Sequence, residues 1–295
     1  MIKDIDKKQV SVIIPAYNEE EGIAASLDNL LATMKSTDLE FEVIVVDDGS
    51  KDKTVEAVSK FDAKDVRLIR HEENRGYGAA LKTGIEQAKY NLIAITDADG
   101  TYPVNCLPEL VGWMGDGYDM AVGARTGKRV RIPFMRRLPK IILNKYANYL
   151  INYKIPDLNS GLRVFRKDLY RKFRNLLPDG FSFTSTITLA LLSNSYRVKY
   201  IPIDYYKREG KSKIKPVRDT INFFTLVSRI SLYFGPLRIF MPLTLALLGL
   251  GVILLGNDVF FADNISDKTI LTFFLGMQFG LIGLLADIII HQRQD

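Results

Sequence analysis

The sequence predicts an α/β fold with a mainly parallel sheet, followed by a C-terminal segment that crosses a membrane twice. Short apolar runs alternate with stretches of helical periodicity in the amino-terminal part of the chain, which is the pattern of a parallel sheet covered by helices. Several of these runs end abruptly in acidic loops, and two long stretches near the carboxyl terminus are almost free of charge. A chain of 295 residues can hold one large domain of this kind and an appendage.

Charge and cysteine content narrow the class of protein. The formal net charge is +6, but much of the excess falls between Arg125 and Arg238. A local cationic region favours contact with anionic small molecules or lipid, and we expect no nucleic acid partner. Cys106 is the only cysteine, which excludes a disulfide framework and a cysteine-rich metal site and fits a reducing compartment.

The predicted strands are short apolar runs, and three of them stop at a proline or an aspartate. Pro15 ends the first run, and a helix with apolar positions from Ile23 onward follows it as far as Ser36. Strands and helices then alternate, so the sheet should be parallel with helices on both faces. The predicted strands are residues 10–14, 41–46, 66–69, 92–96 and 122–124, and a second helix covers residues 79–89.

Three polar loops follow predicted strands and should meet in one crevice. They cover residues 15–19, 47–49 and 97–99. In open parallel sheets the ligand lies beyond the carboxyl ends of the strands. The glycines of residues 74–78 do not complete a dinucleotide fingerprint, because that pattern requires a glycine where Leu81 stands.

Asp97 and Asp99 are the pair around which the predicted site is organised. They stand two residues apart at the end of a buried strand, close enough to share one hard divalent cation that also binds phosphate oxygens. A hard divalent cation is therefore the expected ligand of this pair. A solvated acidic turn is the alternative for this pair taken alone.

The carboxyl-terminal part predicts two membrane-spanning helices. No residue from Ile239 to Leu255 is charged, and Asp287 is the only charged residue from Ile270 to Ile290, so each run is long enough to cross ~30 Å of hydrocarbon. Lysines and arginines flank the pair while aspartates predominate between them, which predicts a cytoplasmic location for both termini and for the large domain. A buried helical hairpin of a soluble protein is the alternative.

The motifs in order resemble those of family 2 glycosyltransferases with the GT-A fold, a nucleotide-sugar-binding fold. They are P-A-Y-N-E-E from Pro15, V-V-D-D-G-S from Val45, N-R-G-Y-G from Asn74 and D-A-D from Asp97. Later motifs are most similar to those of polyprenyl-phosphate glycosyltransferases, the dolichol-phosphate mannose synthase group. These later motifs are G-A-R at 123–125, D-L-N-S-G-L-R at 157–163 and R-E-G-K-S-K at 208–213.

The resemblance implies a nucleotide site and a metal site that would hold Mg²⁺ or Mn²⁺ on the diphosphate. A carboxylate that accepts a hydrogen bond from a base N–H would recognise the nucleotide, and a tyrosine ring would offer a stacking face. For Asp47 and Asp48, a role as cap of the next helix is the alternative. Thr101 stands where this group commonly has a further metal ligand. The implied nucleotide-binding residues are Pro15, Tyr17, Glu19, Asp47, Asp48 and Asp97, and the implied metal ligands are Asp97, Asp99 and Thr101.

The resemblance also implies an acceptor-phosphate site and a catalytic set. The guanidinium group of an arginine can bind two oxygens of a phosphate at once. Lys140 stands where the family has an arginine, and its ammonium group cannot bind in this way. Asp157 would act as a general base or order the acceptor loop. The implied acceptor-phosphate residues are Arg125, Lys140, Asn144, Ser160 and Arg163, and the implied catalytic residues are Asp97, Asp99, Asp157, Arg208 and Lys213.

The expected protein is a metal-dependent, inverting glycosyltransferase of the membrane. It would move a hexose from a GDP- or UDP-linked donor to a dolichyl or undecaprenyl phosphate. The expected organisation is a catalytic domain at 1–215, an interfacial amphipathic helix at 216–235 and a transmembrane hairpin at 236–295. The sequence leaves open whether the protein forms a homo-oligomer. The alternatives are a polysaccharide or a lipid without phosphate as acceptor, and a noncatalytic protein that binds nucleotide sugars.

Overall fold

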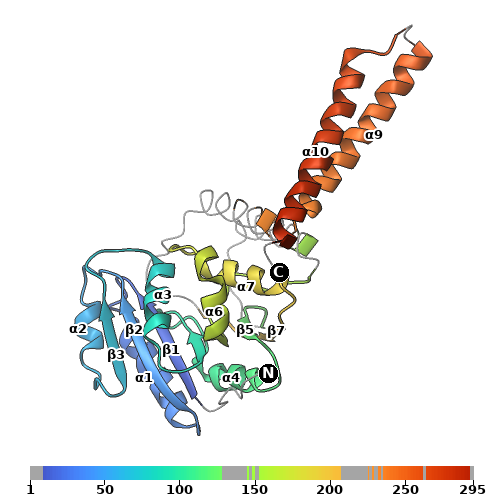
Figure 1. Cartoon of the computed structure of the whole chain (residues 1–295). Helices are drawn as coiled ribbons and strands as arrows, with labels where there is room; N and C mark the ends of the chain where they lie inside the picture. Colours follow the sequence, from blue (N-terminus) through green and yellow to red (C-terminus); the bar gives the residue numbers. More distant parts are fainter. Residues whose placement is uncertain are drawn as a thin grey trace.

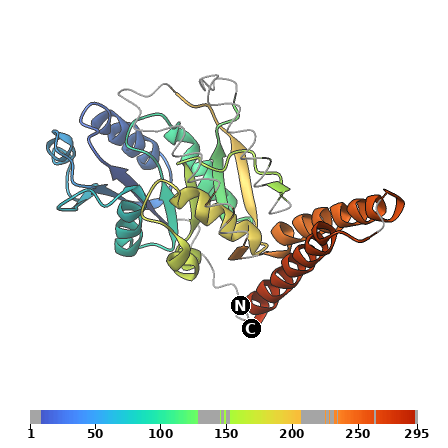
Figure 2. The same ribbon diagram turned by 90° about the horizontal axis from the view of Figure 1, so that it is seen from above.

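The computed structural model has an α/β domain and a helical hairpin that projects from it (Figures 1 and 2). The sequence-based expectations for Lys140, Asn144, Arg208 and Lys213 fall outside the described residues, as does most of the amphipathic segment 216–235. The structure describes residues 9–127, 145, 148–149, 153–206, 225, 228, 232–233, 235–261 and 264–292.

Seven strands form one sheet in the order β3-β2-β1-β4-β6-β5-β7. The four strands β3, β2, β1 and β4 are parallel neighbours, and β5 is parallel to the edge strand β7. The mainly parallel sheet is therefore confirmed. The strands are β1 (Gln9–Ala16), β2 (Glu40–Asp47), β3 (Val66–Arg70), β4 (Leu92–Ile95), β5 (Met120–Ala124), β6 (Arg163–Arg166) and β7 (Val198–Pro202).

The antiparallel strand β6 shapes the site more than any other strand. It pairs with β4 on one side and β5 on the other, with Arg163 opposite Ile95 and Val122. Because β6 runs the other way, its amino end lies at the carboxyl ends of its two neighbours. The loop that leads into β6 therefore reaches the same edge of the sheet as the loops that follow β4 and β5.

Helices cover both faces of the sheet and enclose two apolar cores (Figures 1 and 2). Alternate residues of a buried strand face opposite sides, so Val12 packs in one core and Ile13 in the other. One face carries α1 (Ile23–Lys35), α2 (Thr54–Val58), η1 (Val104–Cys106) and α4 (Leu107–Met114), and the other carries α3 (Tyr77–Gln87), α6 (Lys167–Phe173), η3 (Arg174–Leu176) and α7 (Phe183–Ser193).

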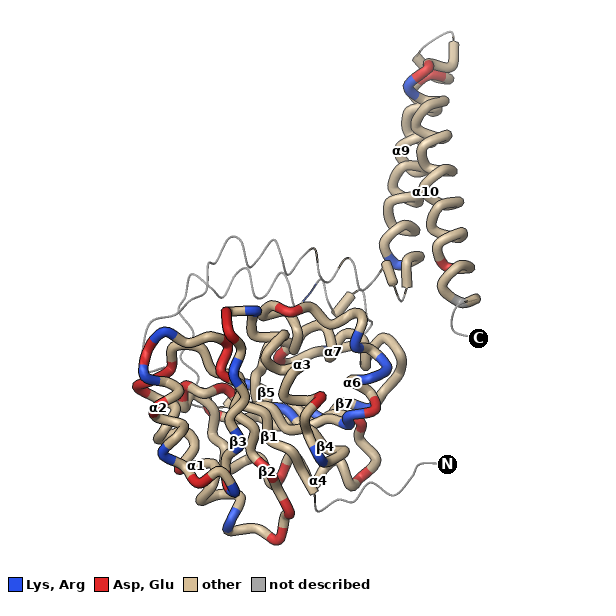
Figure 3. The backbone as a smooth tube through the Cα atoms, turned by 60° about the vertical axis from the view of Figure 1, so that its left-hand side comes forward, with Lys and Arg blue, Asp and Glu red and all other residues tan. Residues whose placement is uncertain are grey.

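The hairpin consists of α9 (Leu237–Phe261) and α10 (Asp267–Gln292). Both helices are long and apolar enough to cross a membrane, and most of their residues are exposed. Figure 3 shows charges gathered near the ends of the hairpin and almost none along it. At the far turn, Asp258 accepts hydrogen bonds from the Ser266 and Thr269 hydroxyls, each at 2.6 Å. These hydrogen bonds close the turn. The length, apolar composition and exposure of the two helices indicate a membrane protein.

Candidate active site

Three loops meet at the carboxyl edge of the sheet, as the sequence predicts. The Asp48 N–H donates to the Ala16 carbonyl at 2.8 Å, which joins the loops that follow β1 and β2. A Cβ placed on Gly22 would lie 3.5 Å from the Asp99 Cα. The loop after β1 therefore also packs directly against the D-x-D loop after β4.

Asp97 and Asp99 follow β4 side by side, and each has a hydroxyl partner. Tyr77 donates its hydroxyl to Asp97 Oδ1 at 3.1 Å, and Thr101 donates its hydroxyl to Asp99 Oδ1 at 2.6 Å. Burial, and next the charge of Asp97, raise the pKa of Tyr77 well above its ordinary value, so that hydroxyl keeps its proton. Both carboxylates are half-buried and held in fixed orientations.

Thr101, an expected metal ligand, contacts Asp99. Its side chain is fully buried, and both its hydroxyl and its N–H donate to Asp99. These contacts position Asp99, and they direct the hydroxyl toward that carboxylate.

The donor set at this point fits a divalent metal that keeps open positions. Two carboxylates are hard oxygen donors, and Mg²⁺ is commonly bound in proteins by one or two carboxylates together with substrate phosphates and water. The described part of the chain has no group of three or more histidine, cysteine or acidic side chains suited to a metal. Asp97 and Asp99 are the two carboxylates at this point that could hold such a metal.

Asp48 holds the loop of residues 74–78 in place. Its carboxylate is buried and accepts the N–H groups of Arg75 at 2.9 Å and Gly76 at 2.8 Å. His71 Nδ1 lies 2.7 Å from the same carboxylate, and His71 Nε2 lies 2.9 Å from the Thr83 hydroxyl. Asp48, an expected nucleotide-binding residue, therefore orders residues 74–78.

Asp47 has a different environment from its neighbour. It is fully buried, and its Oδ2 accepts the Ser50 N–H at 3.3 Å. Its Oδ1 has no hydrogen-bond partner among the described residues. A buried carboxylate oxygen without a donor is costly, so Asp47 Oδ1 is suited to a donor that comes from outside the chain. A cavity of about 290 Å³ lies where the loop after β2 meets the end of β3, and it is lined by Gly49, Ser50, Arg70, His71 and Glu72.

The loop after β1 is tied to the loop after β2. The Glu19 N–H donates to the Thr54 hydroxyl at 2.8 Å, and the Lys51 N–H donates to the Asn18 side-chain oxygen at 2.8 Å. Pro15 is buried within β1, whereas Tyr17 and Glu19 are half-buried at the sheet edge. The structure therefore places these three expected nucleotide residues beside Asp47.

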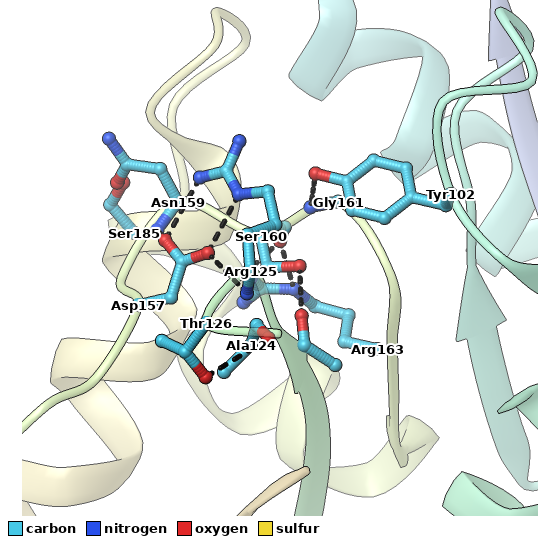
Figure 4. Close-up of polar contacts among 11 residues, drawn as sticks. Tyr102, Ala124, Arg125, Thr126, Asp157, Asn159, Ser160, Gly161, Arg163 and Ser185 are labelled. Carbon is cyan, nitrogen blue, oxygen red and sulfur yellow. Dashed lines mark hydrogen bonds and ion pairs between the residues drawn. The ribbon is translucent and has the colours of Figure 1, made fainter. Parts of the chain in front are cut away.

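Arg125 and Asp157 form a bidentate ion pair (Figure 4). Arg125 Nε lies 2.7 Å from Asp157 Oδ2, Arg125 Nη2 lies 2.9 Å from Oδ1, and the Arg125 N–H donates to Oδ2 at 3.0 Å. Only 1% of the Asp157 side chain is exposed, against 18% for Arg125. The buried aspartate therefore orients the arginine, and Nη1 points away from the pair in Figure 4.

Ser160 and Arg163 fix the conformation of residues 157–162, the expected acceptor loop. The Ser160 hydroxyl donates to the Gly123 carbonyl at 2.5 Å, and Arg163 donates through Nε to the Ser160 carbonyl at 3.1 Å. Arg163 is fully buried, and its Nη1 also donates to the Thr184 carbonyl and the Thr188 hydroxyl. This placement differs from the expected contact with acceptor phosphate, because the guanidinium of Arg163 is enclosed by the fold.

Two aromatic residues connect the acceptor loop with the D-x-D loop. The Tyr102 hydroxyl accepts the Gly161 N–H at 2.6 Å, and the Tyr102 ring packs edge-on against Tyr205 at 5.3 Å. The Arg125 guanidinium lies 5.2 Å from the centre of the Tyr205 ring. Asp97, Gly161 and Arg125 therefore share one side of the sheet edge.

Sequence reasoning missed Tyr77, His71 and Tyr102 as members of the site. Tyr77 belongs to the N-R-G-Y-G motif. That motif indicates that residues 74–78 belong to the site, but it does not predict the hydrogen bond from Tyr77 to Asp97. Phe181 was also missed, although it stacks on Tyr77 at 5.6 Å and leaves 68% of its own surface exposed.

Two families match the chain. The family described as Glycosyl transferase family 2 matches residues 11–174, and the family described as GtrB C-terminal hairpin matches residues 235–291. The first match covers the α/β domain as far as η3, and the second covers α9 and almost all of α10.

Curated relatives extend over most of the chain. A dolichyl-phosphate hexose transferase of Haloferax volcanii is 30% identical over 208 residues, which is 70% of this chain and 87% of the relative. An undecaprenyl-phosphate 4-deoxy-4-formamido-L-arabinose transferase of Pseudomonas fluorescens is 31% identical over 261 residues, which is 85% of this chain and 73% of the relative.

A solved structure shares the fold. Glucosyl-3-phosphoglycerate synthase from Mycobacterium tuberculosis, crystallised with Mn²⁺, uridine diphosphate and phosphoglyceric acid, superimposes with a TM-score of 0.60 at 18% identity. The superposition covers 76% of this chain and 78% of the synthase. With the sheet order, the motifs and the match over residues 11–174, these similarities show that the chain belongs to glycosyl transferase family 2.

Proposed function

We propose that the protein transfers one hexose from a nucleotide diphosphate sugar to a polyprenyl phosphate, with inversion at the anomeric carbon, at the cytoplasmic face of a membrane. One observation carries the proposal. The acceptor loop packs directly on the first carboxylate of the D-x-D pair, with the oriented Arg125 beside it. A phosphate held by Arg125 would thus lie next to a sugar diphosphate held at Asp97 and Asp99.

The names of the relatives support a phosphorylated polyprenyl acceptor. The Haloferax volcanii relative is named for dolichyl phosphate and the Pseudomonas fluorescens relative for undecaprenyl phosphate. The hairpin supports a lipid acceptor as well, since it would place the catalytic domain at the bilayer surface. We infer the cytoplasmic orientation from the basic flanks of the hairpin and the aspartates at its far turn.

The donor would lie along the edge formed by the loops after β1, β2 and β4. Asp47 Oδ1 would accept a base N–H, which would satisfy its missing hydrogen bond. Tyr17 and Glu19 would line the same part of the crevice. A bound Mg²⁺ or Mn²⁺ would be held by Asp97 and Asp99 and would supply positive charge to the diphosphate.

In the proposed reaction the lipid phosphate oxygen attacks the anomeric carbon. The new C–O bond forms as the bond to the nucleotide diphosphate breaks, and the nucleotide diphosphate leaves on the opposite side. A phosphate monoester is already an anion at neutral pH, with a second pKa of ~6, so the attack needs little base catalysis. Asp157 is then available for its role in the structure, which is to hold Arg125.

The test uses membranes that contain the full chain or its Asp99→Ala variant. They are incubated with a panel of labelled GDP- and UDP-sugars, and the acceptor is polyprenyl phosphate, dephosphorylated polyprenol or polysaccharide. The label transferred to lipid is then extracted into the organic phase and measured. We expect transfer to polyprenyl phosphate by the wild type and at least a hundredfold loss in Asp99→Ala.

Asp116→Ala is the matched control. Asp116 is exposed and precedes β5, at the end of that strand opposite to Arg125, so its removal should leave transfer unchanged. Wild-type transfer by Asp99→Ala in the presence of a chelator would contradict the metal role. Equal transfer to polyprenol and to polyprenyl phosphate would contradict the proposed acceptor.

A further inference from the structure

A second cavity lies where the α/β domain meets the foot of the hairpin. Its volume is about 430 Å³. Its wall combines the loop before β5, the segment between α7 and β7, and the start of α9. The polar side chains in this wall are Tyr118, Tyr153, Ser195, Tyr196, Arg197 and Arg238.

This cavity is separate from the candidate active site. Tyr118 precedes β5 and Arg197 precedes β7, whereas Arg125 follows β5. Since β5 and β7 are parallel, the cavity and the ion pair of Arg125 with Asp157 lie at opposite ends of these strands.

The position of Arg238 places the cavity at the depth of lipid headgroups. Arg238 is the second residue of α9, and the run from Ile239 to Leu255 has no charged residue. That run would extend through roughly 25 Å of hydrocarbon, so its first turn lies at the membrane boundary. The Tyr149 hydroxyl donates to the Arg238 carbonyl at 3.4 Å and adds a contact at this boundary. Tyrosine and arginine are typical of such boundaries.

The cavity wall has the chemistry of a phosphate site. Two guanidinium groups and three phenol rings line it, and none of the described residues in its wall is acidic. The Arg197 guanidinium stacks 4.6 Å from the centre of the Tyr118 ring, which restricts its motion. The nearest acidic group along the chain, Asp119, accepts the Arg197 N–H at 2.9 Å and is paired with Arg166 at 3.1 Å. A planar guanidinium binds phosphate oxygens in bidentate fashion.

Gly117 makes room for Arg197. Its φ of +80° is a left-handed conformation that glycine adopts readily. A Cβ at this position would lie 3.0 Å from Arg197 Nη1. A side chain at residue 117 would therefore displace the guanidinium from its place at the cavity.

We propose that this cavity binds the phosphate headgroup of an anionic phospholipid. Arg197 comes from the α/β domain and Arg238 from the hairpin, so one headgroup would contact both parts of the protein. Such a lipid would fix the α/β domain against the bilayer. The inference depends on the hairpin crossing the membrane and not on the transfer reaction.

The sequence contains a reporter for this site. Trp113 is the only tryptophan, and its ring lies 5.8 Å from Tyr118 and 4.0 Å from Lys199 Nζ. Movement of Tyr118 or of the neighbouring cations when a ligand binds should change its fluorescence.

The test titrates the detergent-solubilised full chain with dihexanoyl phosphatidylglycerol and records Trp113 fluorescence. Native mass spectrometry counts the lipids bound in the same samples. We expect a saturable change with one bound lipid, and at least tenfold weaker binding for Arg197→Gln and for Arg238→Gln. Gly117→Ala should weaken binding similarly while keeping both cations.

Arg171→Gln is the matched control, because Arg171 is exposed on α6 and does not line the cavity. It should bind like the wild type, and all variants should elute as the wild type does in size exclusion. The same titration is repeated with dihexanoyl phosphatidylcholine and with inorganic phosphate. Equal binding of phosphatidylcholine, equal binding of phosphate alone, or unchanged binding by all three cavity variants would overturn the proposal.

Discussion

Gly161 lies against Asp97 with no space for a side chain between them. A Cβ on residue 161 would lie 2.8 Å from both Oδ1 and Oδ2 of Asp97. Such distances are shorter than any ordinary contact, so a side chain at residue 161 must move the carboxylate. The loop that holds Gly161 and the D-x-D loop are therefore in direct contact.

Gly161→Ala should therefore reduce transfer by about a hundredfold, since a displacement of about 1 Å at a reacting centre can cost that much. The measurement is the rate of labelled lipid formation, together with the thermal unfolding midpoint of the purified chain. The midpoint should change by only a few degrees, because the displaced group lies at the edge of the sheet.

Gly112→Ala is the control for this glycine substitution. No heavy atom lies within 4 Å of the position that a Cβ on Gly112 would take. Transfer should stay at the wild-type rate. If Gly161→Ala also kept that rate, the close packing on Asp97 would have no functional role.

Tyr77→Phe should weaken the metal site without removing it. The substitution deletes the hydroxyl that donates to Asp97 Oδ1 at 3.1 Å and keeps the ring that stacks on Phe181. A hydrogen bond to a charged group contributes about 1.5–3 kcal/mol, so Mn²⁺ affinity should fall about tenfold or more. Electron paramagnetic resonance of free Mn²⁺ measures this affinity without reference to activity.

Tyr90→Phe serves as the reference substitution. Tyr90 donates its hydroxyl to Glu40 at 2.8 Å, at the amino end of β4 and away from the D-x-D pair. Its Mn²⁺ affinity should equal that of the wild type. If Tyr77→Phe also bound Mn²⁺ with the affinity of the wild type, the hydrogen bond from Tyr77 to Asp97 would not contribute to metal binding.

The strands at the centre of the fold could be predicted from the sequence, because buried parallel strands are continuous apolar runs. The predicted strand 10–14 corresponds to β1 (Gln9–Ala16), and the predicted 41–46 corresponds to β2 (Glu40–Asp47). Strand β6 was not predicted. Its four residues, R-V-F-R, begin and end with charged side chains, and its antiparallel direction depends on its neighbours in the sheet.

The location of the candidate site could be predicted from the sequence better than the role of each of its residues. The D-x-D pair and the motif aspartates could be placed at strand ends from local sequence alone. The partners of Asp48 are the backbone N–H groups of Arg75 and Gly76, which no sequence pattern identifies. The ion pair of Arg125 with Asp157 joins two loops that only the tertiary fold brings together.

Cys106 should react slowly with alkylating reagents. Burial, and next the charges of Glu109 and Asp204, raise the pKa of its thiol above the ordinary value. A raised pKa lowers the thiolate fraction at any pH below it, so alkylation by iodoacetamide at pH 8 should be slower than in the chain unfolded in urea. Mass spectrometry measures this directly, because Cys106 is the only cysteine. Equal rates would contradict the raised pKa.

Asp157→Asn separates the two roles open to Asp157. The amide keeps the shape of the side chain but removes the charge that pairs with Arg125 at 2.7 Å. If Asp157 positions Arg125, the KM for polyprenyl phosphate should rise about tenfold or more, because charge-assisted pairs orient a guanidinium better than neutral ones. The KM for the donor and the shape of the pH–rate profile should stay as in the wild type.

The matched control is Asp168→Asn, which breaks a bidentate pair with Arg166 on the surface, where 57% of the Asp168 side chain is exposed. A surface pair contributes little, so its kinetics should be unchanged. A general base predicts a different result for Asp157→Asn. In that case kcat would fall by about 10²–10⁴ and the acid limb of the pH–rate profile would disappear, while the KM for the acceptor would stay the same. Steady-state kinetics over a range of pH therefore decides between an aspartate that takes a proton and one that holds an arginine.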